Sequence, residues 1–208
     1  MDDTAHLTLA ELAIGEYSVI RSAYKSEMYG AIVEYFFTEG ARVTRFRNRY
    51  KKAVADYFDQ AFRMGYADAG GDPEAMEPDD QEWLSLAITG EWGYVEELFL
   101  DMKNLKKELD TAEMLDWAAA RAEGYAKTLD GVYNQGKLRG LKGIMLTFTG
   151  DDGIENCRTC DRLKGKRHSA KWWVSRGLAI FRGNRNYECG NWNCRHFFMT
   201  DKGVPYTL

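Results

Sequence analysis

The chain has 208 residues, of which 45% are hydrophobic and 13% aromatic, and its formal net charge is −4. This composition excludes an intrinsically disordered protein, because there is enough apolar surface to bury. No apolar run reaches the ~18 residues of a membrane-spanning helix. We therefore expect a soluble chain without membrane contact, intracellular at synthesis, that builds one good core and a small additional module.

Four long helices are predicted for the first two thirds of the chain. Three of them begin with a capping box, in which two side chains each bond an unpaired helix N–H: Thr8 with Glu11, Asp79 with Glu82, and Asp110 with Glu113. They run to about Thr38, Lys107 and Gly143 respectively, the middle one with an interruption near Gly90 and Gly93. The remaining helix lies between Gly40 and Gly70 and has apolar residues every three or four positions.

Shorter elements are predicted beyond these helices. Residues 144–149 alternate apolar and other side chains and include β-branched ones, which favours a strand. Ser169 is the expected N-cap of a short helix that ends at Gly177. Residues 178–181 predict a second short strand.

All four cysteines of the chain fall in one stretch, from Cys157 to His196. It contains a Cys-x-x-Cys pair and, after twenty-eight residues, a Cys-x4-Cys pair followed closely by a histidine. Two tight clusters of thiols and imidazoles are typical of a tetrahedral zinc site. Two disulfides are the main competing reading, but no signal peptide pattern precedes them, and intracellular thiols stay reduced. A thioredoxin-like redox motif would not need the second pair.

We expect four cysteines to bind one structural zinc ion, with His196 in reserve as a ligand or as a hydrogen-bond donor to a thiolate. The four expected ligands are Cys157, Cys160, Cys189 and Cys194. His168 follows a short basic run and is the weakest of the candidate ligands.

The predicted fold class is mainly α, with an N-terminal long-helix bundle followed by a small zinc-stabilised α+β C-terminal module. The expected domains are an α-helical body at 1–110 and a second region at 111–208, made of a helix, a strand and a zinc-binding module at about 150–200. Four thiolate ligands leave zinc no open position for catalysis. Phosphate-binding, dinucleotide-binding, serine hydrolase and zinc protease motifs are all missing from the sequence. We therefore expect no catalytic residues and no enzyme.

Charge is distributed unevenly along the chain. Residues 154–208 carry a balance of +7 and residues 1–153 a balance of −11. The basic end could face nucleic acid. Its Lys and Arg could equally offset the charge of the zinc thiolates and keep a small module soluble, and the sequence leaves both readings open.

The order of elements in the second half resembles a known family. A helix rich in Arg, Ala and Gly at 121–143 precedes the strand at 144–149 and the Asp151-Asp152 turn; then come Cys157-x-x-Cys160-x-x-Leu163-x-Gly165 and Asn193-Cys194-Arg195. This arrangement is similar to that of the phage Mu F-like family of minor head, or head morphogenesis, proteins, and covers about residues 115–200. The family's closing element often reads His-Pro-Asn-Cys-Arg-Cys. Here Asn191 and His196 stand at its first and last positions, and Cys189 is the expected replacement ligand.

The resemblance implies a structural protein of low copy number in the phage head, present in the host cytoplasm during assembly. Its implied partners are the portal and the capsid or scaffolding proteins, with weak nonspecific contacts to packaged DNA. The alternative is a nucleic-acid-binding zinc protein such as a regulator, which the basic C-terminal segment motivates. A zinc-dependent nuclease or deaminase is disfavoured, because neither a His-x-Glu nor a paired-His motif is present.

Overall fold

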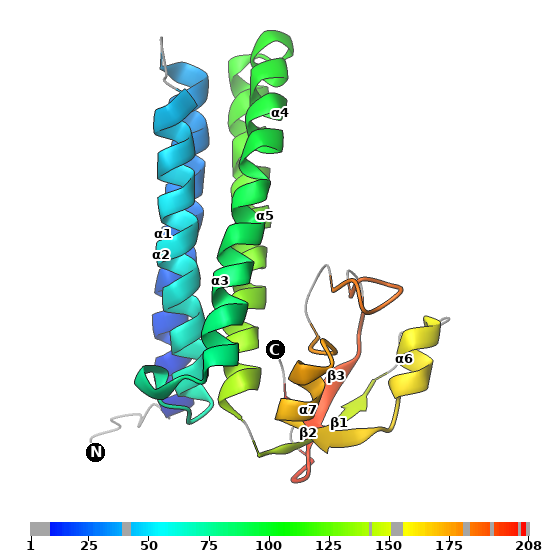
Figure 1. Cartoon of the computed structure of the whole chain (residues 1–208). Helices are drawn as coiled ribbons and strands as arrows, with labels where there is room; N and C mark the ends of the chain where they lie inside the picture. Colours follow the sequence, from blue (N-terminus) through cyan, green and yellow to red (C-terminus); the bar gives the residue numbers. More distant parts are fainter. Residues whose placement is uncertain are drawn as a thin grey trace, which may run out of the picture. The chain divides into compact units, whose positions relative to one another are not determined.

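The computed structural model describes residues 9–38, 43–141, 143–150, 156–180, 184–191, 194–203 and 205–206. By packing it forms two compact units, one of residues 1–61 and 77–130 and the other of residues 62–76 and 131–208. It is mainly helical, as expected, and its C-terminal part contains a small four-stranded sheet (Figure 1). The expected domains, 1–110 and 111–208, stay a prediction, because packing units need not be folding domains. Among the helices described, none combines the length and apolarity that crossing a membrane requires.

The first unit is a helical bundle. Its helices are α1 (Leu9–Phe37), the first part of α2 (Val43–Asp68), α3 (Pro78–Gly93), α4 (Val95–Glu108) and the first part of α5 (Thr111–Gly140). Large side chains fill its core, and Tyr24, Tyr50, Phe58 and Met102 are almost completely buried. Helix α3 ends at Gly93 and α4 begins at Val95, with Tyr94 between them. The predicted interruption near Gly93 is therefore confirmed.

The predicted helix starts have different outcomes. Asp110 and Glu113 form the expected capping box, each side chain accepting from the other's backbone N–H at 2.9 Å. The capping box at Asp79 is wrong, because α3 begins at Pro78 and its N-cap is Glu77, two residues before Asp79. Proline suits the first helical position, where its missing N–H costs nothing, and so Asp79 lies inside the first turn. The capping box at Thr8 lies outside the described residues.

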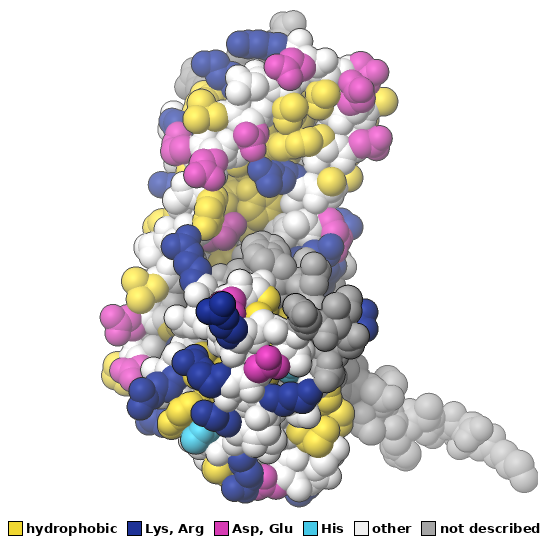
Figure 2. All heavy atoms as spheres, turned by 90° about the vertical axis from the view of Figure 1, so that its right-hand side faces the viewer, with side chains coloured by type: hydrophobic (Ala, Val, Ile, Leu, Met, Phe, Trp, Pro, Cys, Tyr) yellow, Lys and Arg dark blue, Asp and Glu magenta, His cyan; other side chains and the backbone are white. Residues whose placement is uncertain are grey.

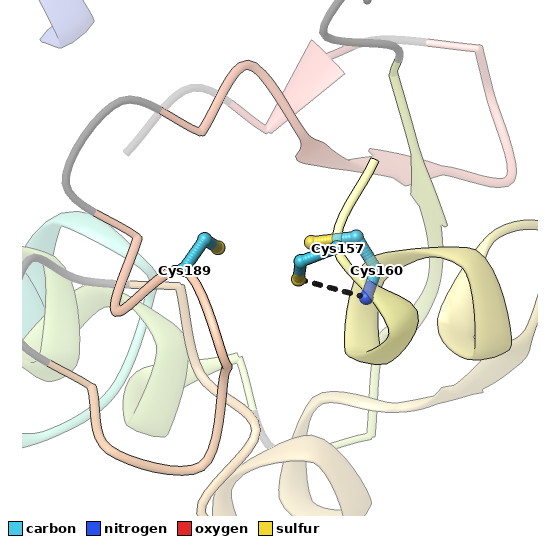
Figure 3. A group of neighbouring side chains, drawn as sticks. All are labelled: Cys157, Cys160 and Cys189. Atoms are coloured by element: carbon cyan, nitrogen blue, oxygen red, sulfur yellow. Dashed lines mark hydrogen bonds between the residues drawn. The ribbon is translucent and has the colours of Figure 1, made fainter. Parts of the chain in front are cut away.

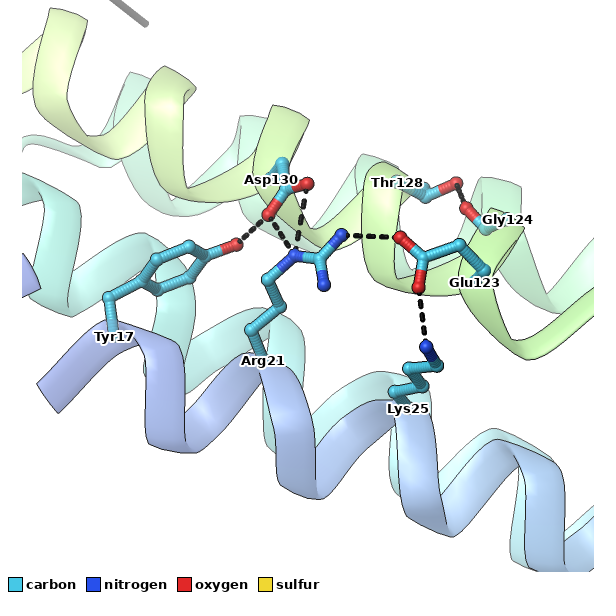
Figure 4. Close-up of polar contacts among 7 residues, drawn as sticks. All are labelled: Tyr17, Arg21, Lys25, Glu123, Gly124, Thr128 and Asp130. Atoms are coloured by element: carbon cyan, nitrogen blue, oxygen red, sulfur yellow. Dashed lines mark hydrogen bonds and ion pairs between the residues drawn. The ribbon is translucent and has the colours of Figure 1, made fainter. Parts of the chain in front are cut away.

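Ionic contacts join α1 to α5 within the first unit (Figure 4). Arg21 pairs with Asp130 at 2.9 Å and with Glu123 at 2.8 Å. Lys25 binds the other oxygen of Glu123 at 2.7 Å, and the Tyr17 hydroxyl donates to Asp130 at 2.7 Å. The Lys25 and Arg21 cations hold the pKa of Glu123 down to about 2. These pairs set how the two helices are aligned along each other, and their partial exposure limits what each adds to stability.

The second unit is built around the sheet. Its strands are β1 (Met145–Thr149), β2 (Arg167–Ser169), β3 (Phe197–Thr200) and β4 (Pro205–Tyr206), all antiparallel and in the order β2-β1-β3-β4. Two short helices complete it, α6 (Arg158–Leu163) and α7 (Ala170–Ser175). The strand predicted at 144–149 is confirmed as β1. Strands β2, β3 and β4 were not predicted.

Around α7 one prediction is confirmed and another is wrong. Ser169 caps α7, its hydroxyl accepting from the Trp172 N–H at 3.2 Å. The predicted strand at 178–181 is not formed in residues 178–180, and Phe181 lies outside the described part. Side chains bond the backbone there in place of a neighbouring strand: Asn184 donates to the Ala179 carbonyl and the Tyr187 hydroxyl to the Leu178 carbonyl, both at 2.6 Å.

The second unit also contains the ends of α2 and α5, which cross at glycines. A Cβ placed on Gly65 would lie 2.0 Å from the carbonyl oxygen of Tyr133, and one on Gly136 would lie 2.1 Å from that of Phe62. Backbone atoms cannot give way as a flexible side chain can. The two helix ends therefore approach each other as closely as they do because neither glycine carries a side chain.

Candidate metal centre

The first cysteine pair lies at the start of α6. Cys157 is the N-cap residue, and its sulfur accepts from the Cys160 N–H at 3.5 Å. One helical turn places Cys160 in the apolar core of the unit, with no exposed surface, beside Phe148 and Leu163. The Cys160 thiol is therefore held in the interior, whereas the Cys157 thiol is half-buried.

The second pair comes from the segment before β3. A turn in which the Gly190 N–H bonds the Tyr187 carbonyl at 2.9 Å presents Cys189. The sulfurs of Cys157, Cys160 and Cys189 all lie within 4.8 Å of one another. Figure 3 shows Cys189 pointing from its loop toward the two cysteines of α6.

Cys160 also belongs to a second group, with Cys194 and His196, whose ligand atoms likewise lie within 4.8 Å of one another. The sulfurs of Cys160 and Cys194 are 3.7 Å apart. Four sulfurs bound tetrahedrally at about 2.3 Å have edges of about 3.8 Å, so this pair is spaced as two ligands of one ion. The predicted cysteines and the reserve histidine thus form two adjoining groups that share Cys160, a cluster that could hold a metal ion.

His196 is 4% exposed and stacks on Phe148, with ring centres 5.0 Å apart and planes 12° from parallel. Its Nδ1 lies 3.2 Å from the Cys194 sulfur. Two ligands of one ion, with bonds of about 2.3 Å and 2.0 Å, would lie about 3.5 Å apart. The imidazole thus lies where it could bind the same ion as Cys194 or donate a ring N–H that orients the Cys194 sulfur.

Glu188 connects the two cysteine pairs. Its carboxylate accepts from the Arg158 N–H at 2.9 Å, at the start of α6. Its own N–H donates to the Thr159 hydroxyl at 3.4 Å. These bonds hold the segment before Cys189 against the helix that carries Cys160. No pattern in the sequence singled out Glu188, because its partners lie about thirty positions away.

The thiols resist joint ionisation when no cation is present. Burial opposes the thiolate of Cys157, but hydrogen bonds from Cys160 and Cys189 outweigh burial and hold its pKa below the ordinary value. Burial, with the neighbouring Cys157 and Cys194, raises the pKa of Cys160 far above its usual range. Because one thiolate discourages the next, joint ionisation requires a positive charge between the sulfurs. A divalent cation would supply that charge.

The other residues considered from the sequence lie outside this cluster or outside the described residues. His168 is in neither group of ligand atoms; its ring stacks on Trp172. Asp151 and Asp152 lie outside the described residues. Comparisons with protein families, with curated proteins and with solved structures find no match.

Proposed function

We propose that the cluster binds one structural zinc ion through Cys157, Cys160, Cys189 and Cys194. Thiolates and imidazoles are the ligands that zinc prefers, and four thiolates complete its tetrahedron. The spacing of Cys160 and Cys194 supports two ligands of the same ion. Burial of Cys160 among apolar side chains supports a structural role, since a buried ligand keeps solvent and substrates away.

In this proposal Cys189 is the fourth ligand and His196 the donor to Cys194. Asn191, at the position of the family's histidine, lies beside Cys189, with its amide oxygen 3.8 Å from the sulfur. We expect Cys189→Ser to weaken zinc binding by more than a hundredfold, because a direct ligand is lost. His196→Ala should weaken it by about tenfold to a hundredfold, as for other outer-shell partners. Competition with a chromophoric chelator measures both affinities, and the reverse ranking would exchange the two roles.

We further propose that the protein is a structural minor head component of a phage, which acts by binding and not by catalysis. One observation carries this proposal. Helix α5 leads into strand β1, α6 presents the first cysteine pair, and Cys194 returns beside it just before β3. This is the order of elements in the Mu F-like resemblance. The proposed partners are the portal and the capsid or scaffolding proteins, with packaged DNA contacted weakly and without sequence preference.

The test is association with phage particles. Purified virions or proheads should contain the protein in low copy, detected by quantitative mass spectrometry against the major capsid protein. A Cys160→Ser variant should be incorporated much less, because it cannot assemble the zinc site, whereas His168→Ala, in the same module but outside the cluster, should be incorporated normally. A protein that is absent from particles yet binds one DNA sequence tightly at physiological salt would be a regulator instead.

A further inference from the structure

The module that carries the candidate metal centre has a basic surface. Lys and Arg predominate over Asp and Glu in the lower part of the face drawn in Figure 2. In the described part of residues 156–202 the exposed cations are Arg158, Arg162, Lys164, Lys166, Arg167, Lys171, Arg176, Arg185, Arg195 and Lys202. The exposed acids of the same part are Asp161, Glu188 and Asp201. Glu188 bonds the start of α6, and Asp201 pairs with Arg167 at 2.7 Å, so two of the acids are already engaged.

Flat side chains lie among these cations where β2 meets α7. The rings of His168 and Trp172 stack with their centres 3.6 Å apart and their planes 16° from parallel, and both residues are half-buried. The guanidinium of Arg176 lies 5.8 Å from the centre of the Trp172 ring. An imidazole, an indole and a guanidinium are thus grouped at the edge of the sheet, since β2 is an outer strand.

Contacts with Trp173 and the Ser169 cap hold this group in place. Trp173 is fully buried and donates its indole N–H to the Leu146 carbonyl at 3.1 Å. Its ring stands perpendicular to that of Trp172, with centres 5.0 Å apart. The Ser169 cap fixes the start of α7. A ligand would therefore meet rings that are already positioned, which lowers the entropy lost on binding.

We propose that this face, made of Lys166, His168, Trp172 and Arg176, binds single-stranded nucleic acid. Exposed cations attract the phosphates of any strand. Bases of a single strand also stack on aromatic rings and on guanidinium planes, whatever their sequence. A duplex hides the faces of its bases, and an anionic membrane has none, so either would use the cations alone. The binding surface goes beyond the proposed function and does not depend on a phage identity.

The first test uses the full-length, zinc-supplemented protein and a fluorescent oligothymidylate of about 16 nucleotides, the upper end of common site sizes. We expect Trp172→Ala to weaken binding by about tenfold, the loss of one stacked base, and Trp172→Phe to restore most of it. Trp92→Ala is the matched control. Trp92 also has a cation near its ring, Lys51 at 5.6 Å, but lies in α3 of the first unit, and its loss should leave binding unchanged.

The second test addresses the cations. Lys166→Glu combined with Arg176→Glu should weaken binding further and reduce the slope of log affinity against log salt by at least about one, because two phosphate contacts are lost. Lys103→Glu with Lys107→Glu, exposed on α4, makes the same charge change in the first unit and should have little effect. Equal circular dichroism and metal content in every variant show that folding is intact.

Two results would overturn the proposal. One is a duplex of the same length that binds as tightly as the single strand, with no effect of Trp172→Ala. The other is protein that binds anionic phospholipid vesicles through these cations and leaves the oligothymidylate free. Failure of particle association, by contrast, would affect only the proposed phage function.

Discussion

Removal of the metal from the purified protein is expected to unfold the sheet and the cysteine segments while most of the helical signal remains. Cys160 lies in the core with Phe148 and Trp173, so the ligands and the core form together. Structural zinc contributes about 10–16 kcal/mol in small zinc-dependent folds, more than a small module otherwise has. Metal analysis should find about one zinc per chain. A chelator should shift the summed emission of the six tryptophans to the red, because the fully buried Trp173 becomes exposed, and change far-ultraviolet circular dichroism little.

Two variants test whether this unfolding depends on the zinc site. Cys160→Ser should show the red-shifted emission before any chelator is added, and added zinc should not reverse it. His168→Ala should respond to the chelator as the unaltered protein does, because its ring is outside the cluster. A native preparation that is folded, free of metal and oxidised at its thiols would contradict the zinc site.

Gly136→Ala is expected to destabilise the second unit by about 3 kcal/mol, at the upper end for overpacked sites. The added Cβ would lie 2.1 Å from the Phe62 carbonyl oxygen, so α2 and α5 would have to separate. The gain of about 1 kcal/mol that alanine brings to a helix is too small to offset this. Chemical denaturation, followed by tryptophan emission, measures the loss.

Gly124→Ala makes the same substitution in the same helix at an exposed position, where a Cβ meets nothing within 4 Å. It should stabilise the helix by about 1 kcal/mol, because only the helix propensity changes. The two variants should therefore change the free energy of unfolding in opposite directions. Equal effects would show that helix propensity decides, and not the crossing of α2 and α5.

Much of the helical part follows from local rules that the sequence displays directly. Periodic apolar residues and the capping box at Asp110 predict helices, because both act within a few residues. The start of α3 was misplaced because Pro78, at the first helical position, outweighed the pattern at Asp79. The glycine crossing was not predicted, since a close approach of backbones depends on which helices meet.

In the C-terminal module the gathering of the cysteines was predictable, and the strands were less so. Cysteine spacing predicted which side chains gather, because both pairs are local. Strands β2 and β4 are only three and two residues long, too short for an alternating pattern. Residues 178–180 have the composition of a strand. The Tyr187 hydroxyl and the Asn184 amide, however, donate to the carbonyls of Leu178 and Ala179, so that no strand pairs there.

The pairing of β1 with β3 also determines when the module can form during folding. Phe148 pairs with Phe198, so the segment with both cysteine pairs must close into a loop before this ladder exists. Such distant pairings form slowly, whereas contacts between neighbouring helices form early. Until the loop closes, the edges of β1 and β3 are open to other chains. In the proposed zinc protein, the supply of metal during synthesis would therefore set how long new chains remain prone to aggregation.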